Sequence, residues 1–371
     1  MGRLNKSKLN IVIVVTYTYP YIGSGIGNVA LNQAIRLSKL GHNVTIISSN
    51  YPKSKSEFKR SGVTHLKMNA NFILEKFNVP MPLFIFNQKA KEAIKKSDIV
   101  HIHDSIYISS LFAVLIAKLY KKKVVLTQHI AFLKYKQLLL NLLQKFAYSI
   151  IGKYVFKKSD AIIYFNPQVE ALVTHYRNVI NLPNGVDTNI FKPVSNKVKL
   201  LLRKEFNIPT DKKIILFVGR FVPKKGYRLL FEARSSEYLT IFVGGGIVPD
   251  EFNVDPNVKI FPPQTQTQLA KLYQLSDLFV LPSYGEGFPL SIQEAISTGI
   301  PVITNKENIF DSKLSFIHTI DLNISELKNK IHEVLKMDNS KLQIFERNFA
   351  IKNYSWNTNV NRLIKLYKEL I

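Results

Sequence analysis

The sequence predicts an α/β protein of two consecutive units, each built on a doubly wound parallel sheet. Short runs of apolar and β-branched residues alternate with segments of helical periodicity, which is the pattern of parallel strands joined by crossover helices. This alternation restarts after the turn Pro183-Asn184-Gly185. A length of 371 residues is enough for two units that each bury a core.

The first unit is assigned to residues 1–183. Strands are expected at residues 9–15, 44–48, 99–102, 124–127 and 161–165, and helices at residues 28–40 and 109–120. A glycine-rich turn joins the first strand to its helix, and Gly41 ends that helix. The apolar run at residues 11–15 is too short for a signal peptide, and no run reaches the roughly 18 apolar residues of a membrane span.

The second unit is assigned to residues 184–353. Strands are expected at residues 214–218, 239–243, 258–261, 278–281 and 302–304, with a helix after Gly226. Residues 354–371 form a last segment, whose helix at about residues 357–370 has an apolar face made of Val360, Leu363, Ile364 and Tyr367. We expect this helix to pack back on the first unit.

The charge of the chain is unevenly distributed. Residues 1–183 hold 26 Lys+Arg against 7 Asp+Glu, and the remainder holds 25 against 19, for a net charge of +25. No nucleic-acid-binding signature accompanies this excess, so no nucleic-acid partner is expected. The asymmetry favours an anionic membrane surface or a phosphorylated acceptor over a Lys-rich bias that only maintains solubility.

The chain has no cysteine, which excludes disulfides, thiolate catalysis and Cys-based metal sites. Hydrophobic residues make up 46% of the sequence and charged residues 21%, as in ordinary folded proteins. We therefore expect a cytoplasmic protein, attached peripherally to the inner face of the cell membrane if the basic surface binds lipid.

Two glutamates separated by seven residues, Glu286 and Glu294, lie between an expected buried strand and a helix. Glu286 falls in the glycine-containing loop and Glu294 inside the helix. Carboxylates accept hydrogen bonds from paired hydroxyls, and free N–H groups at a helix start attract phosphate. A bare pair at this spacing would more often be two solvated glutamates. The surrounding strand, glycines and helix favour a site for sugar, ribose and diphosphate.

Two cations follow the first expected strand of the second unit, in Gly219-Arg220 and Lys225-Gly226. A guanidinium and an ammonium five residues apart at the carboxyl end of a parallel strand suit a diphosphate. The alternative is that they are two of many surface cations. Their place at the expected crevice favours the phosphate interpretation.

Three histidines also lie at strand ends. His129 comes just after the run at residues 124–127, where it could polarise or hydrogen-bond a transferred sugar. His101 and His103, with Asp104, end another strand. Residues two apart on a strand share a face, which would suit zinc, but no third protein ligand is identifiable. A crevice or packing role is favoured, and no metal is expected.

The glycine-rich turn contains Gly23, Gly25 and Gly27. It lacks the Gly-Lys-Ser/Thr sequence of a Walker A loop, and Asn28 stands where a dinucleotide-binding fingerprint needs glycine. Its backbone amides are suited to approach an acceptor or a phosphate, and a simple tight turn is the alternative.

Residues 131–158 place large apolar residues near helical spacing among several lysines. A basic amphipathic face that rests on a membrane fits this pattern. A core-packed helix with solvated lysines fits it equally well.

Several segments, in order along the chain, resemble the large family 4 of retaining glycosyltransferases. They are the glycine turn through Gly41-His42, Asp98-Ile99-Val100-His101, Leu182 to Asp187, Phe217-Val218-Gly219-Arg220 with Lys225-Gly226, the Glu286–Glu294 element and Thr298 to Ile303. Trp356 and the last helix match the closing segment of the family. The ordered set spans nearly the whole chain and is far more specific than any one motif.

The resemblance implies the GT-B fold, in which two Rossmann-like domains face a central cleft. It implies an acceptor in the first domain and a nucleotide-diphosphate sugar, UDP- or GDP-linked, in the second. The expected reaction is a retaining transfer of a hexose to a lipid-linked or glycan acceptor, for glycolipid, glycoprotein-glycan or polysaccharide assembly. The family needs neither a bound metal nor a cofactor.

The same resemblance implies roles for individual residues. Arg220 and Lys225 match the diphosphate-binding pair, Glu286 the residue that reads the hydroxyls of the donor sugar, and Glu294 the ribose-binding residue. His129 matches a histidine near the transferred sugar. The expected catalytic residues are thus His129, Arg220, Lys225 and Glu286, and the donor site is completed by Gly219, Gly287, Phe288, Pro289 and Leu290.

Two departures from the family pattern leave the nucleotide base and the donor sugar open. Residues 304–309 replace the usual Gly-Gly-x-Pro-Glu stretch, and the second unit is short between Gly226 and Gly244. The rival hypotheses are a GT-B relative, such as a sugar-nucleotide epimerase or a phosphorylase, and a non-catalytic nucleotide-sugar-binding protein. No lysine is marked for pyridoxal phosphate, and the intact cations and glutamates argue against a decayed site.

Overall fold

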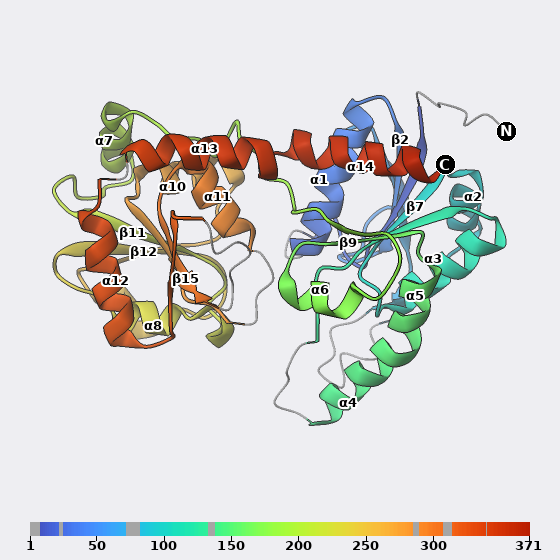
Figure 1. The fold of residues 1–371 in the computed structure, drawn as a ribbon, viewed down its shortest axis with the longest axis horizontal. Helices are drawn as coiled ribbons and strands as arrows, with labels where there is room; N and C mark the ends of the chain where they lie inside the picture. Colours follow the sequence, from blue (N-terminus) through green and yellow to red (C-terminus); the bar gives the residue numbers. More distant parts are fainter. Residues whose placement is uncertain are drawn as a thin grey trace. The chain divides into compact units, whose positions relative to one another are not determined.

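The computed structural model describes residues 8–21, 25–71, 82–132, 138–284, 289–306, 314–338 and 340–371. The chain forms two compact α/β units (Figure 1). Unit 1 comprises residues 1–183 and 359–371, and unit 2 comprises residues 184–358. The last segment, expected to begin at residue 354, therefore joins unit 1 only from Asn359. Ser355 pairs with Val186 in an isolated parallel bridge, which keeps it in unit 2.

Unit 1 is built on an eight-stranded sheet with the order β10-β9-β8-β7-β1-β2-β4-β3. All neighbouring strands are parallel except β3, which pairs antiparallel with β4 at one edge. The strands are β1 (Asn10–Val14), β2 (Asn43–Ser49), β3 (Glu57–Arg60), β4 (Val63–Met68), β7 (Ile99–His103), β8 (Lys123–Thr127), β9 (Ala161–Tyr164) and β10 (Val179–Asn181). Two short strands, β5 (Ala70–Asn71) and β6 (Leu83–Phe84), form a separate pair.

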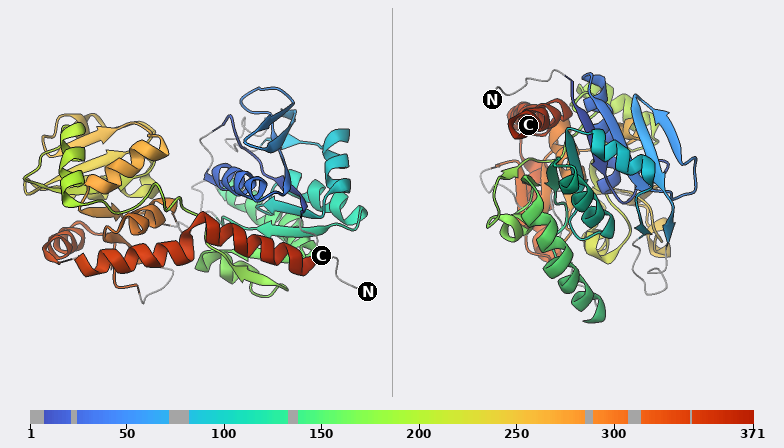
Figure 2. Two further views of the ribbon diagram at one scale, coloured as in Figure 1. Left: turned by 90° about the horizontal axis from the view of Figure 1, so that it is seen from above. Right: turned by 90° about the vertical axis from the view of Figure 1, so that its right-hand side faces the viewer.

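Helices cover both faces of this sheet, and one helix, α4 (Leu138–Ala147), projects away from it (Figures 1 and 2). The others are α1 (Gly25–Lys39), α2 (Gln88–Lys96), α3 (Ile108–Leu119), α5 (Lys153–Lys158), α6 (Pro167–Val173) and α14 (Trp356–Leu370), with a π-helical turn, η2 (Tyr148–Gly152). Val12 and Val14 of β1 join a core that also contains residues of α2, α3 and α5. His101 of β7 contacts Tyr367 of α14 on the other face, and Gln33 of α1 donates to Asn359 of α14 at 3.3 Å.

Unit 2 is built on a six-stranded, wholly parallel sheet with the order β13-β12-β11-β14-β15-β16. The strands are β11 (Lys213–Val218), β12 (Tyr238–Val243), β13 (Val258–Phe261), β14 (Leu278–Leu281), β15 (Val302–Asn305) and β16 (Ile317–Ile320). The helices are α7 (Asn196–Glu205), α8 (Tyr227–Glu232), α9 (Asp250–Asn253), α10 (Gln266–Leu275), α11 (Leu290–Thr298), α12 (Ile324–Lys336) and α13 (Ser340–Tyr354), with a 3-10 turn, η3 (Pro223–Lys225). Helices α7, α10, α11 and α13 pack in one layer, and α8 packs with α12 in another (Figure 1).

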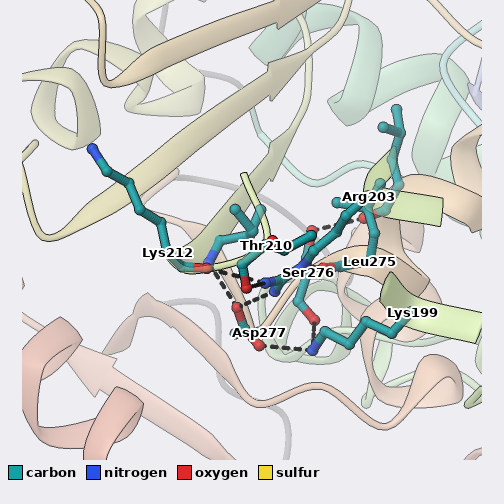
Figure 3. Close-up of polar contacts among 9 residues, drawn as sticks. Lys199, Arg203, Thr210, Lys212, Leu275, Ser276 and Asp277 are labelled. Carbon is teal, nitrogen blue, oxygen red and sulfur yellow. Dashed lines mark hydrogen bonds and ion pairs between the residues drawn. The ribbon is translucent and has the colours of Figure 1, made fainter. Parts of the chain in front are cut away.

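A buried ion-pair network anchors the amino ends of two central strands in unit 2 (Figure 3). Asp277, just before β14, accepts from Arg203 and Lys199 of α7, each at 2.7 Å, and from the backbone N–H of Ile214 in β11. Burial opposes ionisation of Asp277, but the two cations and this N–H outweigh it and lower its pKa. The network lies at the edge opposite the carboxyl ends of the strands, so it stabilises the sheet and leaves the other edge open to ligands.

The strands expected from the sequence are confirmed, with differences of at most one residue at their ends. The edge hairpin β3–β4 was not expected, because β3 is largely polar and β4 buries His65 and Lys67, which interrupt its apolar pattern. In the described part of the chain, no helix has both the length and the apolar character needed to cross a bilayer.

Each sheet has one point at which the strand order reverses, between β1 and β7 in unit 1 and between β11 and β14 in unit 2. In doubly wound sheets the crossover connections diverge at this point and leave a crevice at the carboxyl ends of the strands. The two reversals therefore identify where each unit is expected to bind a ligand.

Candidate functional site

In unit 2, the cations predicted from the sequence lie at the carboxyl end of β11. Gly219 donates its N–H to Val243 O at 2.9 Å, which holds the turn that carries Arg220 against β12. The Arg220 side chain is exposed. A Cβ placed on Gly219 would lie 3.5 Å from Cδ of Lys225, so the stem of Lys225 runs along this glycine. The turn thus brings the two cationic side chains to the same strand end.

Glycines let the neighbouring turns pack closely at this edge. Gly226 has φ +70°, and a Cβ there would lie only 2.0 Å from Pro282 O, at the end of β14. A Cβ on Gly244 would lie 1.8 Å from Gly219 O. Tyr284 donates its N–H to Lys224 O at 3.1 Å. The loop after β14 is therefore joined directly to the turn that carries Lys225.

Of the predicted carboxylates, Glu294 is described, whereas Glu286 lies outside the described residues, as do Gly287 and Phe288. Pro289 is buried and caps α11, and Leu290 is its first residue. Glu294 follows one turn later, partly exposed. The strand order of unit 2 reverses between β11 and β14, and α11 is the helix that follows β14. Glu294 therefore lies in the helix next to this reversal.

Glu294 has a partner that the sequence did not indicate. The hydroxyl of Tyr273, in α10, donates to Glu294 Oε2 at 3.1 Å and lies 3.0 Å from Ser291 O. Burial raises the pKa of Glu294 to about 8, and the bond from Tyr273 opposes this shift. No local sequence pattern indicates that Tyr273 contacts Glu294, because Tyr273 occupies an ordinary buried position of α10.

In unit 1, three imidazoles form a ladder across β7 and the turn after β8. The ring centroids of His101 and His103 are 4.8 Å apart, and those of His103 and His129 are 5.1 Å apart, with interplanar angles of 25° and 22°. His103 Nδ1 lies 2.8 Å from His129 Nε2. Burial lowers the pKa of His101 and of His129 to about 3 and that of His103 well below its usual value. All three rings are therefore neutral at pH 7.

The surroundings of His101 bear on the zinc interpretation. Its Nδ1 lies 2.6 Å from the hydroxyl of Tyr367 and its Nε2 lies 2.7 Å from Oγ1 of Thr127. Both ring nitrogens are thus engaged by protein hydroxyls. Across the described ranges, no three His, Asp or Glu side chains are grouped so that they could hold a metal ion.

Asp104 ties the turn after β7 to the turn after β8. It adopts a left-handed conformation (φ +65°), which Asp tolerates better than most residues. Its N–H donates to Thr127 O at 2.9 Å, and its Oδ1 accepts from the N–H of His129 at 2.7 Å. Burial raises the pKa of Asp104 to about 7, against backbone bonds from His129 and Ile130 that lower it.

The glycine turn after β1 is described in part. Gly23 lies outside the described residues, Gly25 is the first residue of α1 with open space around its Cα, and Gly27 is buried in the same helix. The helix start thus stands at the β1 side of the strand-order reversal. His103, the last residue of β7, and Asp104, just after it, stand on the other side of this reversal.

The segment at residues 131–158 divides into α4, η2 and α5. Helix α4 projects from the body of unit 1 (Figures 1 and 2). Its side chains Leu138 and Phe146 are 72% and 65% exposed, and Lys145 is exposed beside them. Residues 138–158 contain no acidic side chain. The described part of this segment therefore presents an exposed apolar and basic surface, in contrast to α5, which buries Val155 and Phe156.

Comparisons with known proteins agree with this architecture. The profile described as "Glycosyltransferase Family 4" matches residues 23–190, and the profile "Glycosyl transferases group 1" matches residues 198–349. Over 133 residues the chain is 34% identical to D-inositol 3-phosphate glycosyltransferase of Mycolicibacterium smegmatis. That alignment covers 32% of this chain and 30% of the relative, so less than a third of each protein is matched.

Two solved structures show the same fold over nearly the whole chain. Sucrose-phosphate synthase from Thermosynechococcus elongatus superposes with a TM-score of 0.74 at 19% identity, and covers 98% of this chain and 99% of its own. Anabaena Alr3699/HepE in complex with UDP and glucose superposes with a TM-score of 0.73 at 14% identity, and the match covers 97% of this chain and 100% of the Anabaena chain. Since the two profiles together match most of both units, the chain belongs to the family-4, group-1 glycosyltransferases and has their two-domain GT-B fold.

Proposed function

We propose that the protein is a retaining glycosyltransferase that moves a hexose from a nucleotide-diphosphate sugar to a lipid-linked or glycan acceptor. The observation that carries this proposal is the placement of Arg220 and Lys225 at the carboxyl end of β11, beside the strand-order reversal of unit 2. Cleavage of a sugar–diphosphate bond leaves negative charge on the phosphate. Two positioned cations stabilise that charge as it develops.

The donor is held by unit 2. Glu294 on α11 accepts hydrogen bonds from the ribose hydroxyls, and Glu286 reads the hydroxyls of the sugar. A UDP-linked donor is favoured, since the similar Anabaena structures hold UDP and UDP-glucose, and a GDP-linked donor is the alternative. His129 acts from unit 1 on the transferred sugar.

The transfer proceeds on one face of the sugar and needs no metal. The acceptor hydroxyl attacks from the side of the departing diphosphate, and the leaving phosphate takes its proton. Arg220 and Lys225 take the place that a divalent cation would have in stabilising the leaving group.

We further propose that unit 1 docks peripherally on anionic membrane through α4. Exposed apolar side chains are costly in water and stable at a lipid interface, and nearby lysines are attracted to anionic headgroups. A membrane-associated acceptor with a phosphate group suits the basic surface of unit 1. The partial likeness to an enzyme named for inositol 3-phosphate supports a phosphorylated acceptor.

The test is a thermal-shift screen with UDP-, GDP- and ADP-sugars, followed by analysis of the product of the stabilising donor. A donor present at 100 times its Kd should stabilise the fold by about 2.7 kcal/mol. We expect a UDP-sugar to give the largest shift, and NMR of the product to show the anomeric configuration of the donor. The reaction should survive excess EDTA. Inverted product, or complete loss of activity restored by Mg²⁺ or Mn²⁺, would contradict the mechanism.

A further inference from the structure

The hydrogen bond between His103 and His129 joins two neutral rings, so one ring must donate its proton and the other must accept it. Their nitrogens, Nδ1 of His103 and Nε2 of His129, are 2.8 Å apart. A neutral imidazole has one donor and one acceptor nitrogen. Either His103 donates and His129 carries its own proton on Nδ1, or His129 donates from Nε2 and its Nδ1 is an acceptor. The two arrangements present opposite hydrogen-bonding groups at His129 Nδ1.

The other nitrogen of His103 distinguishes these arrangements. His103 is 1% exposed, and among the described residues its Nε2 is buried with no hydrogen-bond partner. If His103 donates from Nδ1, only a lone pair is left without a partner at Nε2. If His103 accepts at Nδ1, its proton lies on Nε2, and a buried N–H is left without an acceptor. Buried N–H groups without partners are the rarer case in folded proteins, so donation from His103 is favoured.

We infer that His103 is a positioning residue that fixes His129 as its Nδ1–H tautomer, so that His129 offers the transferred sugar a hydrogen-bond donor. The inference rests on the proposed function, in which His129 faces that sugar. The oxygen atoms of sugar hydroxyls accept hydrogen bonds from a neutral N–H. A His129 held in this tautomer has no acceptor nitrogen available for a substrate proton and cannot act as a general base.

The surrounding turns hold the ring in place without help from a ligand. Asp104 Oδ1 accepts from the backbone N–H of His129 at 2.7 Å. Gln128 Oε1 accepts from the N–H of Ser105 at 3.0 Å, and Gln128 Nε2 donates to Ile130 O at 2.7 Å. The two turns are therefore joined by bonds in both directions, on either side of His129.

Packing restricts the His129 ring on two sides. His103 meets the ring edge to edge through its nitrogen, with the two ring planes 22° apart, and Phe165 meets it at 70° with centroids 5.3 Å apart. His129 keeps 7% of its surface exposed, against 1% for His103. His103 is thus an inner residue that acts through His129 and does not itself contact substrate.

The tautomer can be measured directly on the ligand-free full-length protein labelled with ¹⁵N-histidine. Long-range ¹H–¹⁵N spectra distinguish the two neutral tautomers and the imidazolium, and a His129→Gln variant identifies the His129 signals by their loss. We expect a neutral Nδ1–H ring at pH 7. A neutral Nε2–H ring or an imidazolium would overturn the inference. Because this measurement needs no substrate, a failure of the proposed transfer reaction would be seen separately, as the absence of turnover with every nucleotide sugar.

Two substitutions of His103 separate its hydrogen bond to His129 from the packing of its ring. His103→Phe keeps a ring between His101 and His129 but removes the donor. His103→Asn removes the ring and keeps an amide N–H near the position of Nδ1. We expect His103→Phe to release the tautomer of His129 and to lower kcat about tenfold, with the KM for the donor little changed. We expect His103→Asn to retain the Nδ1–H signal and most of kcat.

The opposite pattern, with full kcat and an unchanged tautomer in His103→Phe, would show that His103 serves packing alone. If His103→Phe does not fold, the wild-type spectrum and the His103→Asn variant still decide the matter. Loss of the Nδ1–H signal in His103→Asn with unchanged kcat would also contradict the inference.

Discussion

The hydroxyl of Tyr273 donates to Oε2 of Glu294 at 3.1 Å and so links α10 to the helix that begins after β14. The same hydroxyl lies 3.0 Å from Ser291 O, one turn before Glu294. The ring of Tyr273 is buried and packs against Phe191 and Phe279. A phenol fixed in this way restricts the rotamers of the carboxyl group that we propose binds ribose.

Replacing Tyr273 with Phe should weaken binding of the nucleotide donor about fivefold, because one hydrogen bond contributes about 1 kcal/mol. The ring packing is kept, so the fold should be little affected. Calorimetric titration with UDP measures the change. Tyr238→Phe is the matched control, since its hydroxyl bonds to Ala233 O, and it should leave UDP affinity unchanged. Equal affinity in wild type and Tyr273→Phe would show that the phenol does not orient Glu294 for the ligand.

Replacing Arg220 or Lys225 with Ala should lower the rate of transfer by one to two powers of ten. Each substitution removes a charge-assisted contact to the diphosphate that contributes about 1.5–3 kcal/mol. Steady-state kinetics with the best donor measures the loss. Arg228→Ala is the control, because Arg228 lies in α8 of the same unit and pairs with Glu251 on the surface. Near-normal turnover of the Arg220→Ala, Lys225→Ala double variant would contradict the assignment of the site.

Replacing Glu346 with Gln should make stability less dependent on pH. Glu346, in α13, is 1% exposed, and neither carboxylate oxygen has a hydrogen-bond partner in the described structure. Burial raises its pKa from 4.5 to about 9. The folded state therefore retains a proton that the unfolded state releases between these two pH values, so wild-type stability falls as pH rises through this window.

We expect wild type and Glu346→Gln to unfold alike near pH 5 and the variant to be the more stable at pH 8. The difference between the unfolding free energies of Glu346→Gln and wild type should grow by at most about 1.4 kcal/mol per pH unit. Urea unfolding at pH 5, 6, 7 and 8 measures it. The exposed Glu333, paired with Lys330, supplies the control Glu333→Gln, for which no such growth is expected. A constant difference between wild type and Glu346→Gln would mean that Glu346 is ionised in the folded protein.

The protein should float with strongly anionic liposomes at low salt and be released at high salt. Each lysine near an anionic surface contributes about 1 kcal/mol, and this attraction is screened over about 8 Å at physiological ionic strength. Lys145→Glu in α4 with Lys153→Glu at the start of α5 should abolish flotation. Lys121→Glu with Lys122→Glu, in the turn after α3, makes the same change of charge elsewhere on unit 1 and should weaken it far less. Wild-type protein that stays in the soluble fraction at low salt would overturn the docking proposal.

Features that depend on residues close together in the chain, such as strands and tight turns, could be predicted from the sequence. Parallel strands are buried on both faces and read as short apolar runs, and turns that pack closely need glycine, as at Gly226 and Gly244. Arg220 and Lys225 could be placed because they directly follow such a strand. The strand β4 was missed because tertiary packing, not its own pattern, buries His65 and Lys67. For Glu286, Gly23, Gly287 and Phe288 the sequence prediction stands alone, since they lie outside the described residues.

The sequence by itself determined the two α/β units, their parallel strands and the cations at the end of β11, because these depend on residues close together in the chain. Only the tertiary structure decided which distant residues complete the sites. Tyr273 meets Glu294, and His103 meets His129, across intervals of 21 and 26 residues. The α14 residue Tyr367 reaches His101 across 266. Such contacts arise when strands align side by side and helices pack on them, so sequence periodicity, which reports only burial, does not reveal them.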